Sequence, residues 1–172
     1  MANCADQKVK TCPSGFSQCM SSVSVSSVGD NSMMKGKSCA VDCHSGSINT
    51  GYINTLSVCC DTDGCNVQDV PDPRSIASNG KTCYSCDEQS CLNIMSCSGP
   101  EDRCITATGT SKDKLRVAKG CASKSICDAT TTTVSKVEGI SCCEGNLCNG
   151  AQSVTQSFLF LCCSLLSYFM MH

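Results

Sequence analysis

The sequence has no tryptophan and few aromatic residues of any kind, with three Tyr and four Phe among 172 residues. Large apolar side chains are therefore too scarce to build an extensive core. Small domains already bury a smaller fraction of their surface than large ones. A chain of this composition needs another source of stability, such as covalent cross-links or bound metal.

Histidine is also scarce, since His44 is the one histidine before the C-terminal His172. This makes a Ser-His-Asp triad untenable, and no Gly-rich phosphate-binding loop occurs. Asp61, Asp63 and Glu144 lie between closely spaced cysteines and are interpreted as solvated loop residues. We therefore predict a protein that is not an enzyme and needs no cofactor.

The formal net charge is −2, and acidic and basic residues are mixed along the chain. No basic patch of the kind that binds nucleic acid is evident, so no nucleic-acid partner is predicted. The chain also contains no Asn-x-Ser/Thr acceptor, so N-glycosylation is not expected.

What the chain has in abundance is cysteine, with 20 in 172 residues. This exceeds the roughly 8–10% that marks a disulfide scaffold. A native disulfide contributes about 2–4 kcal/mol, so four or five in each part of the chain replace a missing core. Because disulfides persist only in oxidising compartments, the protein is predicted to be extracellular.

Zinc is the competing explanation for so many cysteines. Only Cys83 and Cys86 have the C-x2-C spacing of a zinc knuckle, and adjacent cysteines such as Cys142 and Cys143 cannot easily face one tetrahedral ion. We therefore predict no metal site. An intracellular zinc protein would instead carry stoichiometric metal and free thiols.

One cysteine pattern occurs twice, about eighty residues apart. Residues 59–66 and residues 142–149 both read C-C-x4-C-N. Repetition at this spacing indicates a duplicated module. The stretch from 67 to 80 contains two prolines and several small polar residues, which predicts a semi-extended linker between the modules.

Each module shows the pattern of β-hairpins, and neither contains a convincing helix. Residues 104–121 alternate around a polar tip at 109–113, and residues 129–140 are rich in β-branched side chains, so both are predicted to be hairpins. In the first module, residues 23–28 alternate before a turn at 29–31. The predicted class is small, all-β and disulfide-rich.

The second module reads C-x2-C-x4-C-x5-C-x6-C-x16-C-x5-C-x14-C-C-x4-C-N over residues 83–149. This order resembles the signature of the urokinase-receptor and lymphocyte-antigen-six family, the three-finger (LU, snake-toxin-like) domain. The resemblance implies two tandem three-finger domains, in which three hairpin fingers project from a disulfide hub. By the same analogy Asn149 hydrogen-bonds the hub backbone.

The resemblance also implies a disulfide pairing, which sequence alone does not determine. In the second module it is Cys83–Cys104, Cys86–Cys91, Cys97–Cys121, Cys127–Cys142 and Cys143–Cys148. In the first module it is Cys12–Cys39, Cys43–Cys59 and Cys60–Cys65. Cys4 and Cys19 are left unpaired, because the opening C-x2-C and its strand are absent from the first module. They stay free, pair with each other, or pair between chains.

The C-terminus has the pattern of a glycosylphosphatidylinositol (GPI) anchor signal. Small residues at 149–151 precede a polar spacer and an apolar run over residues 158–172, which is shorter than the roughly 20 residues of a membrane-spanning helix. Asn149 is the expected attachment residue, with Gly150 or Ala151 as alternatives. The expected organisation is a truncated domain at 1–66, a linker at 67–80, a complete domain at 81–149 and a removed signal at 150–172.

The N-terminus shows no matching secretion signal, since Met1 to Lys8 has no apolar stretch. Entry into the secretory pathway is required before a GPI lipid is attached. One expectation accounts for this and for the missing opening strand: the sequence is an N-terminally truncated gene product or isoform.

The candidate contact surface is a basic stripe of Lys112, Lys114 and Arg116 on finger two of the second module. Alternate residues of a strand share one face, and a basic face steers an acidic ligand. The alternative is a solvated strand face that discourages edge pairing.

Two functions remain open at this point. The first is a GPI-anchored protein on the cell surface, held in the outer leaflet, that binds an extracellular protein through its fingers. The second is a secreted two-domain inhibitor resembling the three-finger phospholipase inhibitors. The apolar C-terminus favours the first.

Overall fold

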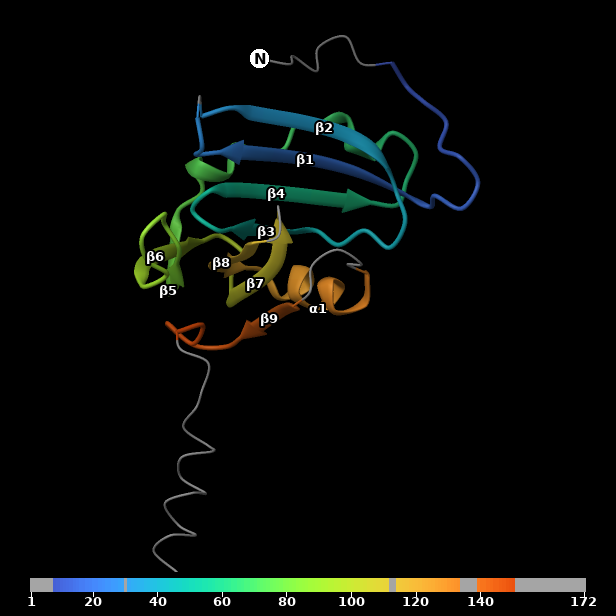
Figure 1. Ribbon diagram of the computed structural model, residues 1–172. Helices are drawn as coiled ribbons and strands as arrows, with labels where there is room; N and C mark the ends of the chain where they lie inside the picture. The colour runs from blue at the N-terminus through green and yellow to red at the C-terminus, as the bar shows by residue number, and fades with distance from the viewer. Residues whose placement is uncertain (1–7, 30, 112–113, 134–138, 151–172) are drawn as a thin grey trace, which may run out of the picture.

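The computed structural model describes residues 8–29, 31–111, 114–133 and 139–150 (Figure 1). Strands dominate it and disulfides cross-link it, so the predicted small, β-rich and disulfide-rich fold is confirmed. The elements are β1 (Gln18–Ser26), β2 (Met33–Ala40), β3 (Gly46–Asn49), β4 (Ile53–Cys60), β5 (Ser78–Ser85), β6 (Asn93–Ser98), β7 (Arg103–Ser111), β8 (Lys114–Ala122), α1 (Lys124–Thr133) and β9 (Gly139–Cys143), with short 3-10 helices η2 (Cys65–Val67) and η3 (Pro73–Ser75).

In the first module, β1 lies between β2 and β4 and is antiparallel to both. The predicted alternation places Val23 and Val25 on the buried face, where they pack with Leu56 of β4. Strand β3 forms a second hairpin with β4. No described residue of this module forms a counterpart of the β5–β6 hairpin.

In the second module, β7 lies between β8 and β9, again with antiparallel pairing. The predicted hairpin at 104–121 is confirmed as β7 and β8. Strands β5 and β6 form a separate two-stranded sheet. The β5–β6 hairpin, the β7–β8 hairpin and β9 rest on a core that is largely sulfur. Its members Cys83, Cys97, Cys104 and Cys121 are each at most 1% exposed.

Two expectations for the second module are wrong. Residues 129–140 do not form a hairpin, and the module does contain a helix, α1. The carboxylate of Asp102 accepts a hydrogen bond from the backbone amide of Lys124 (2.7 Å), which satisfies one donor at the helix N-terminus. The Cys127–Cys142 disulfide then ties the helix to β9. Tertiary contacts thus override the weak helix propensity of the four threonines at 130–133.

The two modules share one seven-stranded sheet, in the order β2-β1-β4-β3-β8-β7-β9 (Figure 1). The junction is an antiparallel pair in which Ile48 and Asn49 of β3 lie opposite Ala122 and Cys121 of β8. Ser123 extends it, because its amide donates to the carbonyl of Ser47 (2.9 Å) and its hydroxyl accepts from the amide of Ser47 (3.1 Å).

The predicted linker at 67–80 is packed against the first module. Val70 is 6% exposed and belongs to the apolar cluster of Val23, Val25 and Leu56. Asp69 pairs with the ammonium groups of Lys35 (3.3 Å) and Lys37 (3.1 Å) on β2. These contacts restrict the movement of the linker between the modules.

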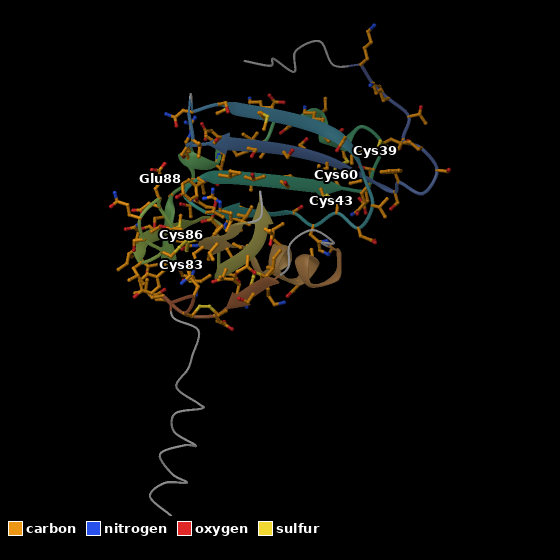
Figure 2. All side chains as sticks on the ribbon, in the orientation of Figure 1. Cys39, Cys43, Cys60, Cys83, Cys86 and Glu88 are labelled. Carbon is orange, nitrogen blue, oxygen red and sulfur yellow. A yellow bond between two sulfur atoms is a disulfide. The ribbon has the colours of Figure 1, made fainter. Side chains whose placement is uncertain are left out.

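Eight disulfides cross-link the described chain, and they join the same partners as the family order implies. They are Cys12–Cys39, Cys43–Cys59, Cys60–Cys65, Cys83–Cys104, Cys86–Cys91, Cys97–Cys121, Cys127–Cys142 and Cys143–Cys148. Cys39, Cys43 and Cys60 gather at one end of the molecule, and Cys83 and Cys86 lie toward the other (Figure 2). Cys19 is the free cysteine among the described residues. Cys4 and the predicted anchor signal at 150–172 lie outside them, apart from Gly150.

Close approach of the two modules depends on two glycines. A Cβ atom on Gly120 of β8 would overlap the carbonyl oxygen of Asn49 and lie 2.8 Å from the Cα of Thr50. A Cβ atom on Gly46 of β3 would overlap the hydroxyl of Ser123 and lie 2.8 Å from Ile126 Cγ1. Neither contact leaves room for a side chain.

We expect Gly120→Ala to destabilise the folded protein, because the overlap is with backbone and the β3–β8 pair must separate to relieve it. Overpacking costs about 1–3 kcal/mol. The matched control is Gly109→Ala on the neighbouring strand β7, where nothing lies within 4 Å of the added Cβ. Thermal unfolding measures both. Equal melting temperatures for the two variants would contradict this account of the junction.

A buried carboxyl group lies beside the same junction. Glu101 is 2% exposed, and its Oε2 accepts a hydrogen bond from the amide of Ser98 (2.8 Å). Burial raises the pKa of Glu101 above its ordinary value, while the Ser98 amide and the Ser47 hydroxyl of the first module act in the opposite direction. A raised carboxyl pKa in the folded state makes the protonated form the more stable one.

The stability that protonated Glu101 contributes is therefore fully present below the pKa that this group has in the unfolded chain. It is lost as the pH rises through the pKa that the group has in the folded protein. We expect Glu101→Gln to raise the melting temperature at pH 7, with the difference shrinking as the pH falls toward 4. Glu88→Gln, at an exposed position, is the control and should change nothing. A melting temperature lowered by Glu101→Gln at pH 7 would show that the carboxylate itself stabilises the fold.

Candidate functional site

A groove of about 760 Å³ opens where the second module meets the tip of the first. Its walls come from three segments far apart in the sequence: the turn before β4, the loop between β5 and β6, and the paired strands β7 and β8. The residues that carry its chemistry are Tyr52, Asp87, Glu88 and Arg116. The groove therefore belongs to both modules.

The floor of the groove is formed by the β7–β8 hairpin. Ala107 of β7 lies opposite Ala118 of β8, on the face of the hairpin that also carries Arg116, because alternate residues of a strand share one face. Side chains this small leave the sheet accessible to an incoming side chain. Gly109, which lies opposite Arg116, opens the same surface further.

Arg116 is the member of the predicted basic stripe that the structure places at the groove. Its side chain is exposed and forms no ion pair with any side chain in the described ranges. Lys114 lies two residues earlier on β8, opposite Ser111, but its side chain lies outside the described part of the chain. Lys112 lies outside it entirely. Of the three residues in the predicted stripe, Arg116 is therefore the one whose side chain the structure describes.

The loop of residues 86–91, closed by the Cys86–Cys91 disulfide, forms the second wall. The carboxylate of Asp87 accepts hydrogen bonds from the amides of Gln89 and Ser90 and from Asn93 Nδ2, each at 2.7 Å. These bonds hold the pKa of Asp87 below its ordinary value, with the Gln89 amide the largest cause. Asp87 thus holds the loop in shape.

Glu88 follows Asp87 and is exposed at the groove, where Figure 2 shows it near Cys86. It forms no hydrogen bond or ion pair with the rest of the described chain. With Arg116 it makes a pair of unengaged charges of opposite sign at one groove. A negative and a positive group beside an apolar floor suit the surface of a protein ligand, whose charges are also mixed.

Tyr52 is the first module's contribution. It follows Gly51, whose positive φ of 81° is the turn conformation that glycine tolerates best. The carbonyl of Tyr52 accepts a hydrogen bond from the amide of Ser27 (2.8 Å), which fixes the turn against the end of β1. Tyrosine is among the residues enriched at binding interfaces. Neither Tyr52 nor Glu88 was expected at a site from the sequence.

A second, smaller groove of about 350 Å³ lies beside α1. Its charged residues are already paired, because Arg103 contacts Asp102 (3.1 Å) and Glu144 (3.6 Å), and Lys124 contacts Asp128. A ligand would have to displace these partners. The groove at Tyr52 and Arg116 is the better candidate.

The described chain has one cluster dense enough in sulfur to hold a metal, formed by Cys83, Cys97 and Cys121, whose sulfur atoms lie within 4.8 Å of one another. All three belong to disulfides. A disulfide sulfur is not the thiolate that zinc requires. In this oxidised state the cluster is a structural hub.

That hub also positions the groove. The side chain of Asn149 is 6% exposed; its Oδ1 accepts from the amide of Tyr84 (2.9 Å), and its Nδ2 donates to the carbonyls of Tyr84 (2.9 Å) and Ile105 (3.0 Å). These bonds join β5 to β7 at the base of the fingers. The loop and hairpin that line the groove project from this base.

The helices in the described ranges are all too short or too polar to cross a membrane.

Comparison with known proteins gives two kinds of match. The family described as snake toxin and toxin-like protein matches residues 1–66 and residues 82–149. These two ranges correspond to the two modules, and together they cover more than half of the chain.

Among individual relatives, the urokinase plasminogen activator surface receptors of Rattus norvegicus and Bos taurus are 34% and 32% identical over 127 and 117 residues. Those matches cover 63% and 58% of this chain but only 38% and 35% of the receptors. The prostate stem cell antigen of Mus musculus is 35% identical over 95 residues, which is 49% of this chain and 76% of that protein.

Proposed function

Because this chain belongs to the snake toxin and toxin-like family, with two three-finger regions in tandem, we propose that it is a non-catalytic binding protein of the cell surface. Its ligand is an extracellular protein. The observation that carries the proposal is the groove at the module junction, where Glu88 and Arg116 are exposed and unengaged beside an apolar floor. The receptor names of the relatives support the same class.

The groove suits a protein ligand better than a small substrate. It is open, its polar groups do not converge on one point, and it holds no nucleophile paired with a base. Tyr52, Glu88 and Arg116 come from three different segments, so the ligand contacts both modules at once. We infer that the ligand presents an apolar side chain flanked by charges of both signs.

We further propose that a GPI lipid holds the protein in the outer leaflet. The pattern of residues 149–172 supports this. The carbonyl of Gly150 accepts a hydrogen bond from Lys119 Nζ (2.7 Å), and Asn149 is engaged in the hub. Attachment at Gly150 or Ala151 preserves the Asn149 contacts, so we favour these residues over Asn149.

Anchoring predicts release by a phosphatidylinositol-specific phospholipase C. With the full chain expressed in mammalian cells behind a secretion leader, the enzyme should move surface protein into the medium. The released protein should end at residue 150 or 151 and carry the phosphoethanolamine bridge, as read by mass spectrometry. Abundant protein in the medium before treatment, ending near residue 172, would instead support the secreted inhibitor.

Ligand binding predicts sensitivity to charge at the groove. Cells displaying the full chain are screened against a library of tagged extracellular proteins, and hits are titrated on variants. Arg116→Glu and Glu88→Lys should each weaken binding about tenfold or more, as expected for a central interface residue. Asp61→Lys, which reverses an exposed charge away from the groove, is the matched control. A hit that Asp61→Lys weakens equally would bind elsewhere.

A further inference from the structure

Asparagine is followed directly by glycine at two places in the chain, Asn79–Gly80 and Asn149–Gly150. Glycine has no Cβ to shield its backbone nitrogen and adopts conformations that other residues avoid. That nitrogen can therefore reach the side-chain carbon Cγ of the preceding asparagine and displace ammonia from it. The structure places the two pairs in contrasting surroundings.

Asn79 lies exposed at the start of β5, with its side chain folded back over the chain that follows it. Its Oδ1 accepts a hydrogen bond from the backbone amide of Lys81 (3.0 Å), which brackets the peptide of Gly80 and holds Cγ of Asn79 beside the Gly80 nitrogen. Gly80 has a φ of 85°, and nothing lies within 4 Å of a Cβ built on it. The site is therefore open to water.

The hydrogen bonds of Asn79 suit the attack of the Gly80 nitrogen on its Cγ. Negative charge develops on Oδ1 during the attack, and the Lys81 amide already donates to that oxygen. The leaving nitrogen Nδ2 donates to the carbonyls of Gly99 and Glu101, each at 2.9 Å. These two bonds persist while Nδ2 becomes ammonia, because ammonia is still a donor.

Asn149 is held away from the peptide of Gly150. It is 6% exposed, its Oδ1 accepts from the amide of Tyr84 on β5, and its Nδ2 donates to the carbonyls of Tyr84 and Ile105. The amide of Gly150 is also engaged, since it donates to the carbonyl of Leu147 (3.2 Å). The same dipeptide is thus protected at one place and open at the other.

We propose that Asn79 is a site of spontaneous deamidation, which loosens the turn that its side chain holds. The Gly80 amide loses its proton to hydroxide, and its nitrogen forms a bond to Cγ of Asn79. The bond from Cγ to Nδ2 breaks, and ammonia leaves with a proton from water. Water then opens the cyclic imide to leave either aspartate or isoaspartate at position 79. The net reaction consumes one water and needs no oxidant or reductant.

The consequence follows from the two carbonyls that face Asn79. A carboxylate at neutral pH only accepts hydrogen bonds, so after deamidation it repels the carbonyl oxygens of Gly99 and Glu101 that the amide now binds. The turn that loses these bonds carries the buried side chain of Glu101, on whose carboxyl the Ser47 hydroxyl of the first module acts. Deamidation therefore weakens the packing beside the module junction.

The first experiment incubates the purified full chain at 37 °C and follows positions 79 and 149 by peptide mapping with mass spectrometry. A free peptide of residues 77–82 is incubated beside it. Position 79 should convert at least as fast in the protein as in the peptide, and about tenfold or more faster than position 149, because the fold holds the reacting groups together only at Asn79. Raising the pH should accelerate conversion, because the attacking nitrogen must lose its proton.

Two results would overturn the assignment of Asn79: conversion slower in the protein than in the free peptide, or equal conversion at positions 79 and 149. Asn79→Gln is the matched control for the chemistry. Its longer side chain closes a six-membered ring slowly, so position 79 should stay unconverted while the rest of the map is unchanged.

The second experiment measures the consequence directly with Asn79→Asp. The melting temperature should fall by several degrees, because two hydrogen bonds are replaced by repulsion. Asn31→Asp makes the same chemical change at an exposed position of the first module and should leave the melting temperature unchanged. Equal melting temperatures for the two variants would overturn the proposed loosening of the turn. Neither experiment depends on the groove or on the lipid anchor.

Discussion

The second module is organised around buried sulfur, whereas the first packs around a small apolar cluster. Cys83, Cys97, Cys104 and Cys121 are almost completely buried, and the side chain of Asn149 joins the strands around them. The cross-links fix the bases of the fingers. The distal surfaces of the fingers are therefore not needed to hold the fold together and are available for binding.

The second organising contact is the short antiparallel pair between β3 and β8. It involves few residues, yet it turns two modules into one sheet and brings Tyr52 over the β7–β8 hairpin. Gly120 and Gly46 allow the backbones to approach this closely. Because both modules line this groove, its shape depends on how they dock. The binding of a ligand there would therefore depend on the arrangement of the two modules.

The two modules are related but not equivalent. Among the described residues, every cysteine of the second module is in a disulfide, whereas the first module has a free cysteine at Cys19. Its remaining strands still fold as a sheet, because Val23, Val25 and Leu56 pack with Val70 from the linker. The linker thus adds Val70 to the apolar core of the first module.

The sequence by itself determined the class of the fold, its two modules and their finger order. The spacing of the cysteines is informative because each gap is the length of a strand or turn between fixed cross-links. The same spacing says nothing of α1, since threonine-rich residues favour a strand until Asp102 and the Cys127–Cys142 bond hold them as a helix. It did not reveal Tyr52 and Glu88 either. Tyr52 reaches the groove of Glu88 and Arg116 through the β3–β8 pairing, a contact between segments over seventy residues apart, which only the tertiary structure decides.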